Sequence, residues 1–174
     1  MTSVSTRLFA GAAGLALGAA LIFGTAGVAA ETAIRAPAAL VSVPNSATSE
    51  TAVFAGGCFW GVQGVFQHVK GVKSAVSGFT GGAADTAHYE RVSDGDTGHA
   101  ESVRVTFDPR VVSYADLLRI YFSVITDPTM LNAQGPDRGT QYRTALFPTS
   151  PAQQKVATAY LAQLRKANLW NKPI

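Results

Sequence analysis

The hydrophobic and polar positions of the chain predict strands and helices from about residue 51 onward. Residues 51–55 form a short apolar run typical of a buried strand, and after two glycines the apolar residues recur at helical spacing. The positions with this helical spacing are Phe59, Val62, Phe66 and Val69. Residues 72–79 alternate enough to predict a second strand, which leads into Gly81-Gly82 and a polar loop.

A second group of elements follows this loop. Residues 100–107 alternate cleanly and predict a third strand. One face of that strand carries Glu101, Val103, Val105 and Phe107. Ser113 and Asp116 form a capping pair ahead of a helix that Asp127-Pro128 ends. The apolar face of that helix comprises Tyr114, Leu117, Leu118, Tyr121, Phe122 and Ile125.

The last two predicted elements are a strand and a helix. Residues 140–147 predict a fourth strand, and a final helix runs from a cap at Ser150-Pro151 to about Asn168. The order is therefore β-α-β, a loop, then β-α-β and a further helix. This is the order of the ferredoxin-like split βαβ arrangement. We expect an α+β two-layer sandwich, in which helices pack on a mainly antiparallel sheet.

The N-terminal residues have a different character. Arg7 precedes an uncharged run, residues 8–30, that ends in Val28-Ala29-Ala30, and this pattern predicts a signal peptide over residues 1–30. The alternative is an uncleaved membrane anchor, but the many glycines and alanines make the run weakly hydrophobic and favour cleavage. We expect an exported, periplasmic protein that contacts a membrane only if this leader is retained. Residues 31–50 lack periodicity and predict a flexible linker, so the working domain spans residues 51–174.

Composition and charge narrow the possible functions. The 174 residues, 47% of them hydrophobic, suit one globular domain, which we expect to be monomeric. The net charge of +3 comes without a basic run, so nothing indicates nucleic-acid binding. A single cysteine cannot form an intramolecular disulfide. A free thiol that is kept in an oxidising compartment suggests that this cysteine has a chemical role.

That cysteine, Cys58, follows Gly56-Gly57 at the predicted start of a helix. A helix N-terminus favours an anion, so we expect the thiol to ionise readily and act as a nucleophile. The alternative is a small apolar core residue. Trp60 lies off the apolar stripe that includes Phe59, which predicts that it faces a pocket beside Cys58.

Glu101 is the second candidate. Its predicted face is apolar, which disfavours the carboxylate, and we expect a raised pKa and a role as an acid. The alternative is that the side chain reaches solvent where the strand begins. His99 is a candidate base for Cys58, and the alternative is a polar surface or loop histidine. The three histidines lack metal-ligand spacing, so we expect no metal.

Three motifs resemble the A-type peptide methionine sulfoxide reductases. They are Gly57-Cys58-Phe59-Trp60-Gly61, Gly98-His99-Ala100-Glu101, and Gln134-Gly135-Pro136-Asp137 continued by Gly139-Thr140-Gln141-Tyr142-Arg143. The resemblance covers roughly residues 52–174, and it implies a ferredoxin-like core. It also implies reduction of methionine S-sulfoxide, free or in oxidised proteins and peptides, without a metal or organic cofactor.

The resemblance further implies a role for each matched residue. Cys58 would attack the sulfoxide sulfur and become a sulfenic acid, while Glu101 would protonate the departing oxygen. Tyr89 and Tyr142 would donate hydrogen bonds to that oxygen. Asp137 would support the polar side of the site, and Phe59 and Trp60 would form the pocket for the substrate's methyl group.

The chain departs from the family pattern in three places. It lacks the C-terminal cysteines that resolve the sulfenic acid in many relatives, so we expect an external reductant, either a thioredoxin-like protein or a small-molecule thiol. Ser93 stands where relatives often carry a cysteine. Relatives also continue past residues 171–174, so we expect a truncated C-terminal end with an open site.

Two other functions use the same residues. A thiol peroxidase would form the same sulfenic acid from a peroxide, although it gives no reason for the position of Trp60. An inactive truncated fragment would bind oxidised peptides without turning them over.

Overall fold

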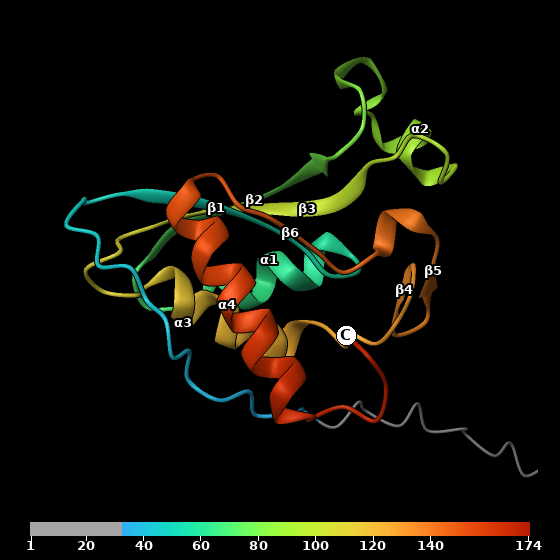
Figure 1. Ribbon diagram of the computed structural model, residues 1–174. Coiled ribbons are helices and arrows are strands. Elements are labelled where there is room, and N and C mark those ends of the chain that lie inside the picture. The colour runs from blue at the N-terminus through green and yellow to red at the C-terminus, as the bar shows by residue number, and fades with distance from the viewer. Residues whose placement is uncertain (1–32) are drawn as a thin grey trace, which may run out of the picture. The chain divides into compact units, whose positions relative to one another are not determined.

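The computed structural model describes residues 33–174, and its largest element is a four-stranded sheet (Figure 1). The strands lie in the order β2-β3-β1-β6, and every neighbouring pair is antiparallel. Their bounds are β1 Glu50–Ala55, β2 Val72–Thr80, β3 Ala100–Phe107 and β6 Ala145–Phe147. This is the order of a split βαβ sheet, so the predicted α+β, ferredoxin-like fold is confirmed. The predicted signal peptide lies outside the described residues.

Helices α1 (Phe59–Gln67) and α3 (Tyr114–Ile120) lie beneath the sheet in Figure 1, and α4 (Pro151–Ala167) packs against α3. The predicted caps are present. The Ser113 hydroxyl accepts a hydrogen bond from the Asp116 N–H at 3.1 Å, and the Asp116 carboxylate accepts one from the Ser113 N–H at 3.1 Å. The Ser150 hydroxyl likewise accepts from the Gln153 N–H. These bonds satisfy N–H groups that a helix start leaves unpaired.

The core lies between the sheet and these helices. Phe54 of β1 is fully buried at its centre, and its ring centroid lies 4.8 Å from that of Phe66, 5.5 Å from that of Tyr121 and 5.9 Å from that of Tyr114. Burying one such apolar side chain contributes roughly 1.5–3 kcal/mol. The core therefore fixes α1 and α3 against β1, and α1 begins next to the only cysteine of the chain.

Several loops contain structure that the hydrophobic pattern does not predict. The loop between β2 and β3 includes the short helices η1 (Ala84–Thr86) and α2 (Tyr89–Ser93). The helix predicted to end at Asp127-Pro128 is confirmed, although its last turn, η2 (Tyr121–Ile125), is π-helical rather than α-helical. The loop after η2 holds a two-stranded hairpin formed by β4 (Ala133–Gln134) and β5 (Asp137–Arg138), which the pattern does not predict.

The fourth strand is shorter than the pattern predicts. Only Ala145–Phe147 pair with β1, whereas Thr140–Tyr142 form a 3₁₀ turn, η3. The prediction of a strand over the whole of residues 140–147 is therefore wrong. The Thr140 hydroxyl donates to the Gly95 carbonyl at 2.7 Å, and this contact turns the segment toward α2 before the strand begins.

The segment before β1 also differs from the predicted flexible linker. Ala36 is fully buried; its N–H donates to the Ser123 hydroxyl at 3.0 Å, and its carbonyl accepts from Arg119 at 3.0 Å. The Tyr160 hydroxyl donates to the Pro37 carbonyl at 2.6 Å. These bonds hold the segment against α3, η2 and α4. Within residues 33–174, no helix combines the length and apolar character needed to cross a membrane.

Candidate active site

The turn between β1 and α1 places Cys58 at the N-cap of α1. Gly57 has φ +92°, and a Cβ atom there would lie 2.7 Å from the side chain of Gln134, so only glycine fits. Cys58 is partly exposed, and its carbonyl accepts the hydrogen bonds of the first turn of the helix. The side chain of Cys58 therefore lies at the N-terminal end of α1, where the sequence predicts it. Cys58 is therefore not a fully buried core residue, which was the alternative.

Glu101 lies next to the same helix start. Its side chain is 5% exposed, and its Oε2 atom accepts a hydrogen bond of 3.0 Å from the Phe59 N–H. Burial raises the pKa of Glu101, and the nearby Asp137 carboxylate raises it further, while the bond from Phe59 opposes both effects. The carboxyl is buried on the core face of β3, as the strand alternation predicts, rather than solvent-exposed at the strand end. It can therefore hold a proton at a higher pH than an ordinary glutamic acid.

Tyr142, at the end of η3, is affected electrostatically by the other candidate site residues. Burial raises the pKa of Tyr142, and so do four neighbouring groups, in decreasing order Glu101, Asp137, Tyr89 and Cys58. Electrostatic effects weaken with distance. The four groups therefore lie within electrostatic range of Tyr142, and they come from the N-cap of α1, β3, α2 and β5.

The two aromatic residues after Cys58 differ in exposure. Phe59 is buried, and its ring centroid lies 5.6 Å from that of Phe79, the β2 partner of Glu101. Trp60 is 73% exposed, as its place off the apolar stripe predicts. The Phe59 ring therefore packs beside the strand partner of Glu101, whereas the Trp60 indole is exposed; the predicted pocket between Trp60 and Cys58 stays a prediction.

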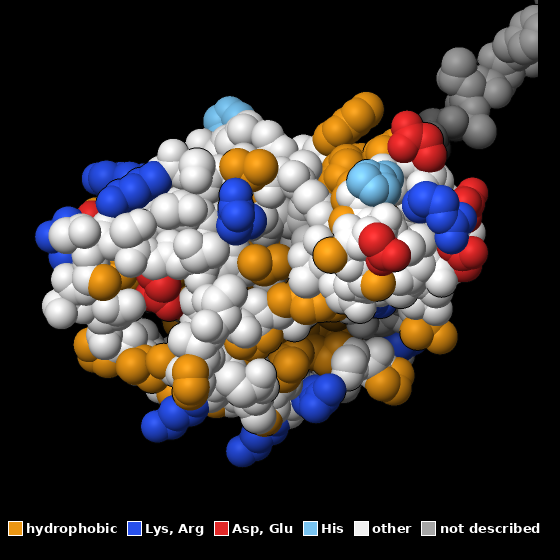
Figure 2. All heavy atoms as spheres, turned by 90° about the horizontal axis from the view of Figure 1, so that it is seen from above, with side chains coloured by type: hydrophobic (Ala, Val, Ile, Leu, Met, Phe, Trp, Pro, Cys, Tyr) orange, Lys and Arg blue, Asp and Glu red, His pale blue; other side chains and the backbone are white. Residues whose placement is uncertain are grey.

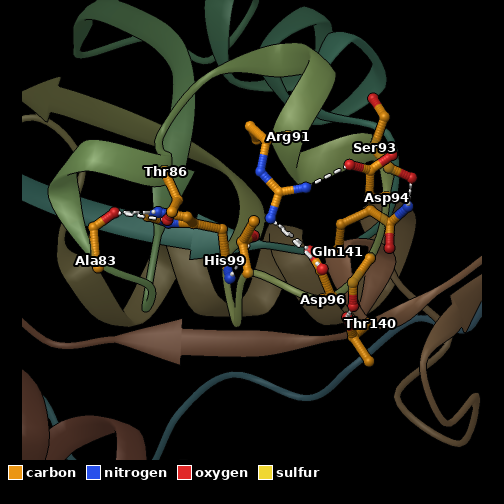
Figure 3. Close-up of polar contacts among 11 residues, drawn as sticks. Ala83, Thr86, Arg91, Ser93, Asp94, Asp96, His99, Thr140 and Gln141 are labelled. Carbon is orange, nitrogen blue, oxygen red and sulfur yellow. Dashed lines mark hydrogen bonds and ion pairs between the residues drawn. The ribbon is translucent and has the colours of Figure 1, made fainter.

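His99 does not serve as a base for Cys58, so this expectation is wrong. His99 lies in the loop before β3, as the alternative predicts, but it is buried there rather than at the surface. The side chain is 3% exposed. Its Nδ1 accepts from the Gly82 N–H at 3.2 Å, and its Nε2 lies 2.9 Å from the Ala83 carbonyl, which assigns the Nε2–H tautomer (Figure 3). With both nitrogens occupied by the backbone, His99 holds the loop after β2.

A second set of contacts holds α2 against η3 (Figure 3). The Gln141 side chain donates to the Ser93 carbonyl at 3.4 Å, alongside the bond from Thr140 to Gly95. On the outer side, Arg91 pairs with Asp94 and Asp96. These contacts bring Tyr89, the first residue of α2, toward Tyr142.

The surface around α2 is acidic. Figure 2 shows acidic side chains gathered at the right-hand end of the molecule in that view, where Figure 1 places α2. The exposed acidic residues of this loop are Asp85, Glu90, Asp94 and Asp96. Within residues 33–174, no three His, Cys, Asp or Glu side chains gather in a way that could hold a metal ion.

Gln134 is a contributor that the sequence analysis did not identify. Its side chain is 9% exposed and packs against Gly57, and its Oε1 accepts from the Thr126 hydroxyl at 2.9 Å and from the Asp127 N–H at 3.2 Å. It therefore supports the turn that presents Cys58. Its place in the Gln134-Gly135-Pro136 motif was visible, but the contact with Gly57 depends on the tertiary fold.

Comparisons with known proteins show which family this chain resembles. The family model described as peptide methionine sulfoxide reductase matches residues 50–174. The chain is 63% identical over 126 residues to peptide methionine sulfoxide reductase MsrA 2 of Mesorhizobium japonicum. The aligned region covers 72% of this chain and 65% of that relative. It is 52% identical over 126 residues to a protein of the same name from Synechocystis, and the aligned region covers 72% of this chain and 59% of that relative. The chain thus spans less than two thirds of the length of these curated relatives.

A solved structure is also similar. The crystal structure of reduced Mxr1 from Saccharomyces cerevisiae superposes with a TM-score of 0.68 at 29% sequence identity, covering 78% of this chain and 77% of that protein.

Proposed function

Because the chain belongs to the peptide methionine sulfoxide reductase family, we propose that it reduces methionine S-sulfoxide, free or in oxidised proteins and peptides. The observation that carries the proposal is the bond of 3.0 Å between the Glu101 carboxylate and the N–H of Phe59, the residue after Cys58. It supports the proposal because it ties a buried acid with a raised pKa to the residue that follows Cys58, the proposed nucleophile at the N-cap of α1. Sulfoxide reduction needs both groups, since the oxygen leaves sulfur only once it is protonated.

The first half of the reaction transfers one oxygen atom and two electrons. The Cys58 thiolate attacks the sulfoxide sulfur, and Glu101 gives its proton to the oxygen. The attack forms a bond between the Cys58 sulfur and the substrate sulfur. The protonated oxygen then passes to the Cys58 sulfur as a hydroxyl, while the substrate's sulfur–oxygen bond and the new sulfur–sulfur bond both break. The products are a thioether, reduced by two electrons, and a Cys58 sulfenic acid, oxidised by two electrons.

The remaining residues of the site bind the substrate in this proposal. The hydroxyls of Tyr89 and Tyr142 donate hydrogen bonds to the sulfoxide oxygen, and Asp137 supports this polar side. Phe59 and Trp60 contact the methyl group. The 73% exposure of Trp60 leaves room for a peptide to lie across the indole.

The second half of the reaction requires a thiol from outside this chain, which contains one cysteine. A first external thiol attacks the sulfenic acid to form a mixed disulfide and releases water, and a second thiolate then frees Cys58 and forms the external disulfide. A thioredoxin-like protein supplies both thiols from one molecule, and a small-molecule thiol supplies them from two.

We also propose that the protein is exported and repairs oxidised proteins in the periplasm, with residues 1–30 as its leader. The support is the uncharged run after Arg7 and the small residues at 28–30. Cell fractionation tests this placement, and N-terminal sequencing of the mature protein tests cleavage after Ala30. Recovery of the full-length chain in the cytoplasm would contradict the proposal.

The activity is tested with a methionine sulfoxide peptide and dithiothreitol. Wild type should reduce the S epimer and leave the R epimer, and Cys58→Ser should be inactive. Full activity of Cys58→Ser would contradict the mechanism. Peroxide consumption faster than sulfoxide reduction would identify a thiol peroxidase, and saturable peptide binding without turnover would identify an inactive binding protein.

A further inference from the structure

Arg143 joins two loops that lead into the site. Its Nη1 atom donates to the His99 carbonyl at 3.0 Å and to the Thr140 carbonyl at 2.8 Å, and its Nη2 atom donates to the Gly98 carbonyl at 2.9 Å. His99 lies two residues before Glu101, and Thr140 lies two residues before Tyr142. One side chain thus connects the segment that starts β3 with the turn that presents Tyr142.

The space around this side chain is closely filled. A Cβ atom on Gly81 would lie 3.0 Å from Arg143 Nη2, and a Cβ atom on Gly82 would lie 2.5 Å from the His99 ring. His99, whose carbonyl Arg143 binds, holds the Gly82–Ala83 backbone with its ring. The loop after β2, the start of β3 and the η3 turn therefore meet around Arg143.

Arg143 acts here through hydrogen bonds to backbone carbonyl oxygens. Arg143 forms no salt bridge with any residue of the described part of the chain. Its planar group instead spans three carbonyl oxygens, a geometry that a lysine ammonium cannot reproduce.

We propose that Arg143 is a positioning residue that fixes Tyr142 relative to Glu101, so that one sulfoxide oxygen can receive a hydrogen bond from the first and a proton from the second. The inference rests on the proposed function. It assigns to Arg143 no contact with the substrate. Its effect on the reaction passes through Tyr142.

The first test is a double-mutant cycle on reduction of the sulfoxide peptide. Arg143→Lys keeps the positive charge but loses the planar guanidinium group that binds the three carbonyl oxygens. It should lower kcat by roughly 10- to 100-fold, which is the loss expected when reacting groups are slightly misplaced. KM should change little. In a Tyr142→Phe background the same substitution should lower kcat by less than about twofold, because the hydroxyl that Arg143 positions is already absent. Additive losses, or an Arg143→Lys enzyme with wild-type kcat, would overturn the proposal.

A second readout is independent of activity. Tyrosine labelled at the ring carbon that bears the hydroxyl gives an NMR signal for Tyr142, assigned by its loss in Tyr142→Phe. Arg143→Lys should release this phenol toward solvent and lower the pKa of Tyr142 toward its ordinary value. An unchanged titration would overturn the proposal, and this readout decides even if wild type reduces no sulfoxide.

Arg110→Lys is the matched control. Arg110 is exposed and binds Asp108, away from the site, so the control should change neither kcat nor the Tyr142 signal. If Arg143→Lys fails to fold, as judged by circular dichroism, Arg143→Gln is measured in both experiments with the same expectations.

Discussion

Glu101 Oε2 accepts a hydrogen bond of 3.0 Å from the backbone N–H of Phe59, the residue that follows Cys58. The bond ties β3 to the first turn of α1, so the carboxyl and the thiol lie at the same helix end. It stabilises the ionised carboxylate and opposes burial, which is the stronger effect and raises the pKa of Glu101. The acid can then keep its proton at a higher pH than an ordinary glutamic acid.

Glu101→Gln should lower kcat/KM for the sulfoxide peptide by roughly 10²- to 10⁴-fold, the usual contribution of a general acid. Glutamine can still accept the Phe59 N–H bond but has no acidic proton to give. Steady-state kinetics with dithiothreitol measure the loss. Glu90→Gln removes the same charge from the exposed surface of α2 and should leave the rate unchanged; equal effects of the two substitutions would rule out an acid role for Glu101.

The pH dependence of sulfenic acid formation should show the same acid. Only protonated Glu101 can donate, so the rate should fall as pH rises through its pKa, which lies above the ordinary glutamic acid value. In Glu101→Gln this falling limb should be absent. Single-turnover rates measured across pH provide the test, and a wild-type profile without a limb that depends on Glu101 would contradict the assignment.

Glu101 should also make stability depend on pH. A carboxyl whose pKa is raised by folding binds its proton more tightly in the folded state, so its stabilising contribution is full below the unfolded pKa, about 4.3, and is lost as pH rises through the folded value. Glu101→Gln should therefore unfold at a higher temperature than wild type at pH 8, with the difference shrinking toward pH 4. Thermal unfolding at both pH values measures this, and a mutant less stable at pH 8 would contradict it.

Gly57→Ala should destabilise the fold by about 1–3 kcal/mol, because φ is +92° and the new Cβ would meet Gln134 at 2.7 Å. Activity should fall as well, since the turn that presents Cys58 must shift. Gly64→Ala in α1 is the control. A Cβ atom there meets nothing within 4 Å, and helix propensity predicts a gain of roughly 0.5–1 kcal/mol. Urea unfolding distinguishes the two, and a neutral Gly57→Ala would show that the turn tolerates a side chain.

Local patterns predicted much of the fold. The alternation of residues 100–107 placed Glu101 on the buried face of β3, and the Ser113–Asp116 pair marked the start of α3. Both features depend on neighbours in sequence. The helical spacing likewise left Trp60 outside the buried face of α1.

Contacts between distant segments could not be predicted in this way. The bond from Thr140 to Gly95 turns residues 140–142 away from the sheet. The bonds of His99 to Gly82 and Ala83 engage both ring nitrogens of a side chain that the sequence suggested as a base for Cys58. Ala36 is buried because Ser123 and Arg119 bind its backbone, although the composition around it is typical of a linker.

A single-turnover experiment without reductant tests the central pairing of Cys58 with Glu101 most directly. The protein is mixed with a methionine S-sulfoxide peptide and dimedone, and the reduced peptide and intact protein mass are measured over time. Wild type should release one equivalent of reduced peptide per chain and gain one dimedone adduct at Cys58. Glu101→Gln should give the same products much more slowly. Cys58→Ser should release no reduced peptide and gain no adduct. Reduced peptide from Cys58→Ser, or an equal rate in Glu101→Gln, would contradict the account.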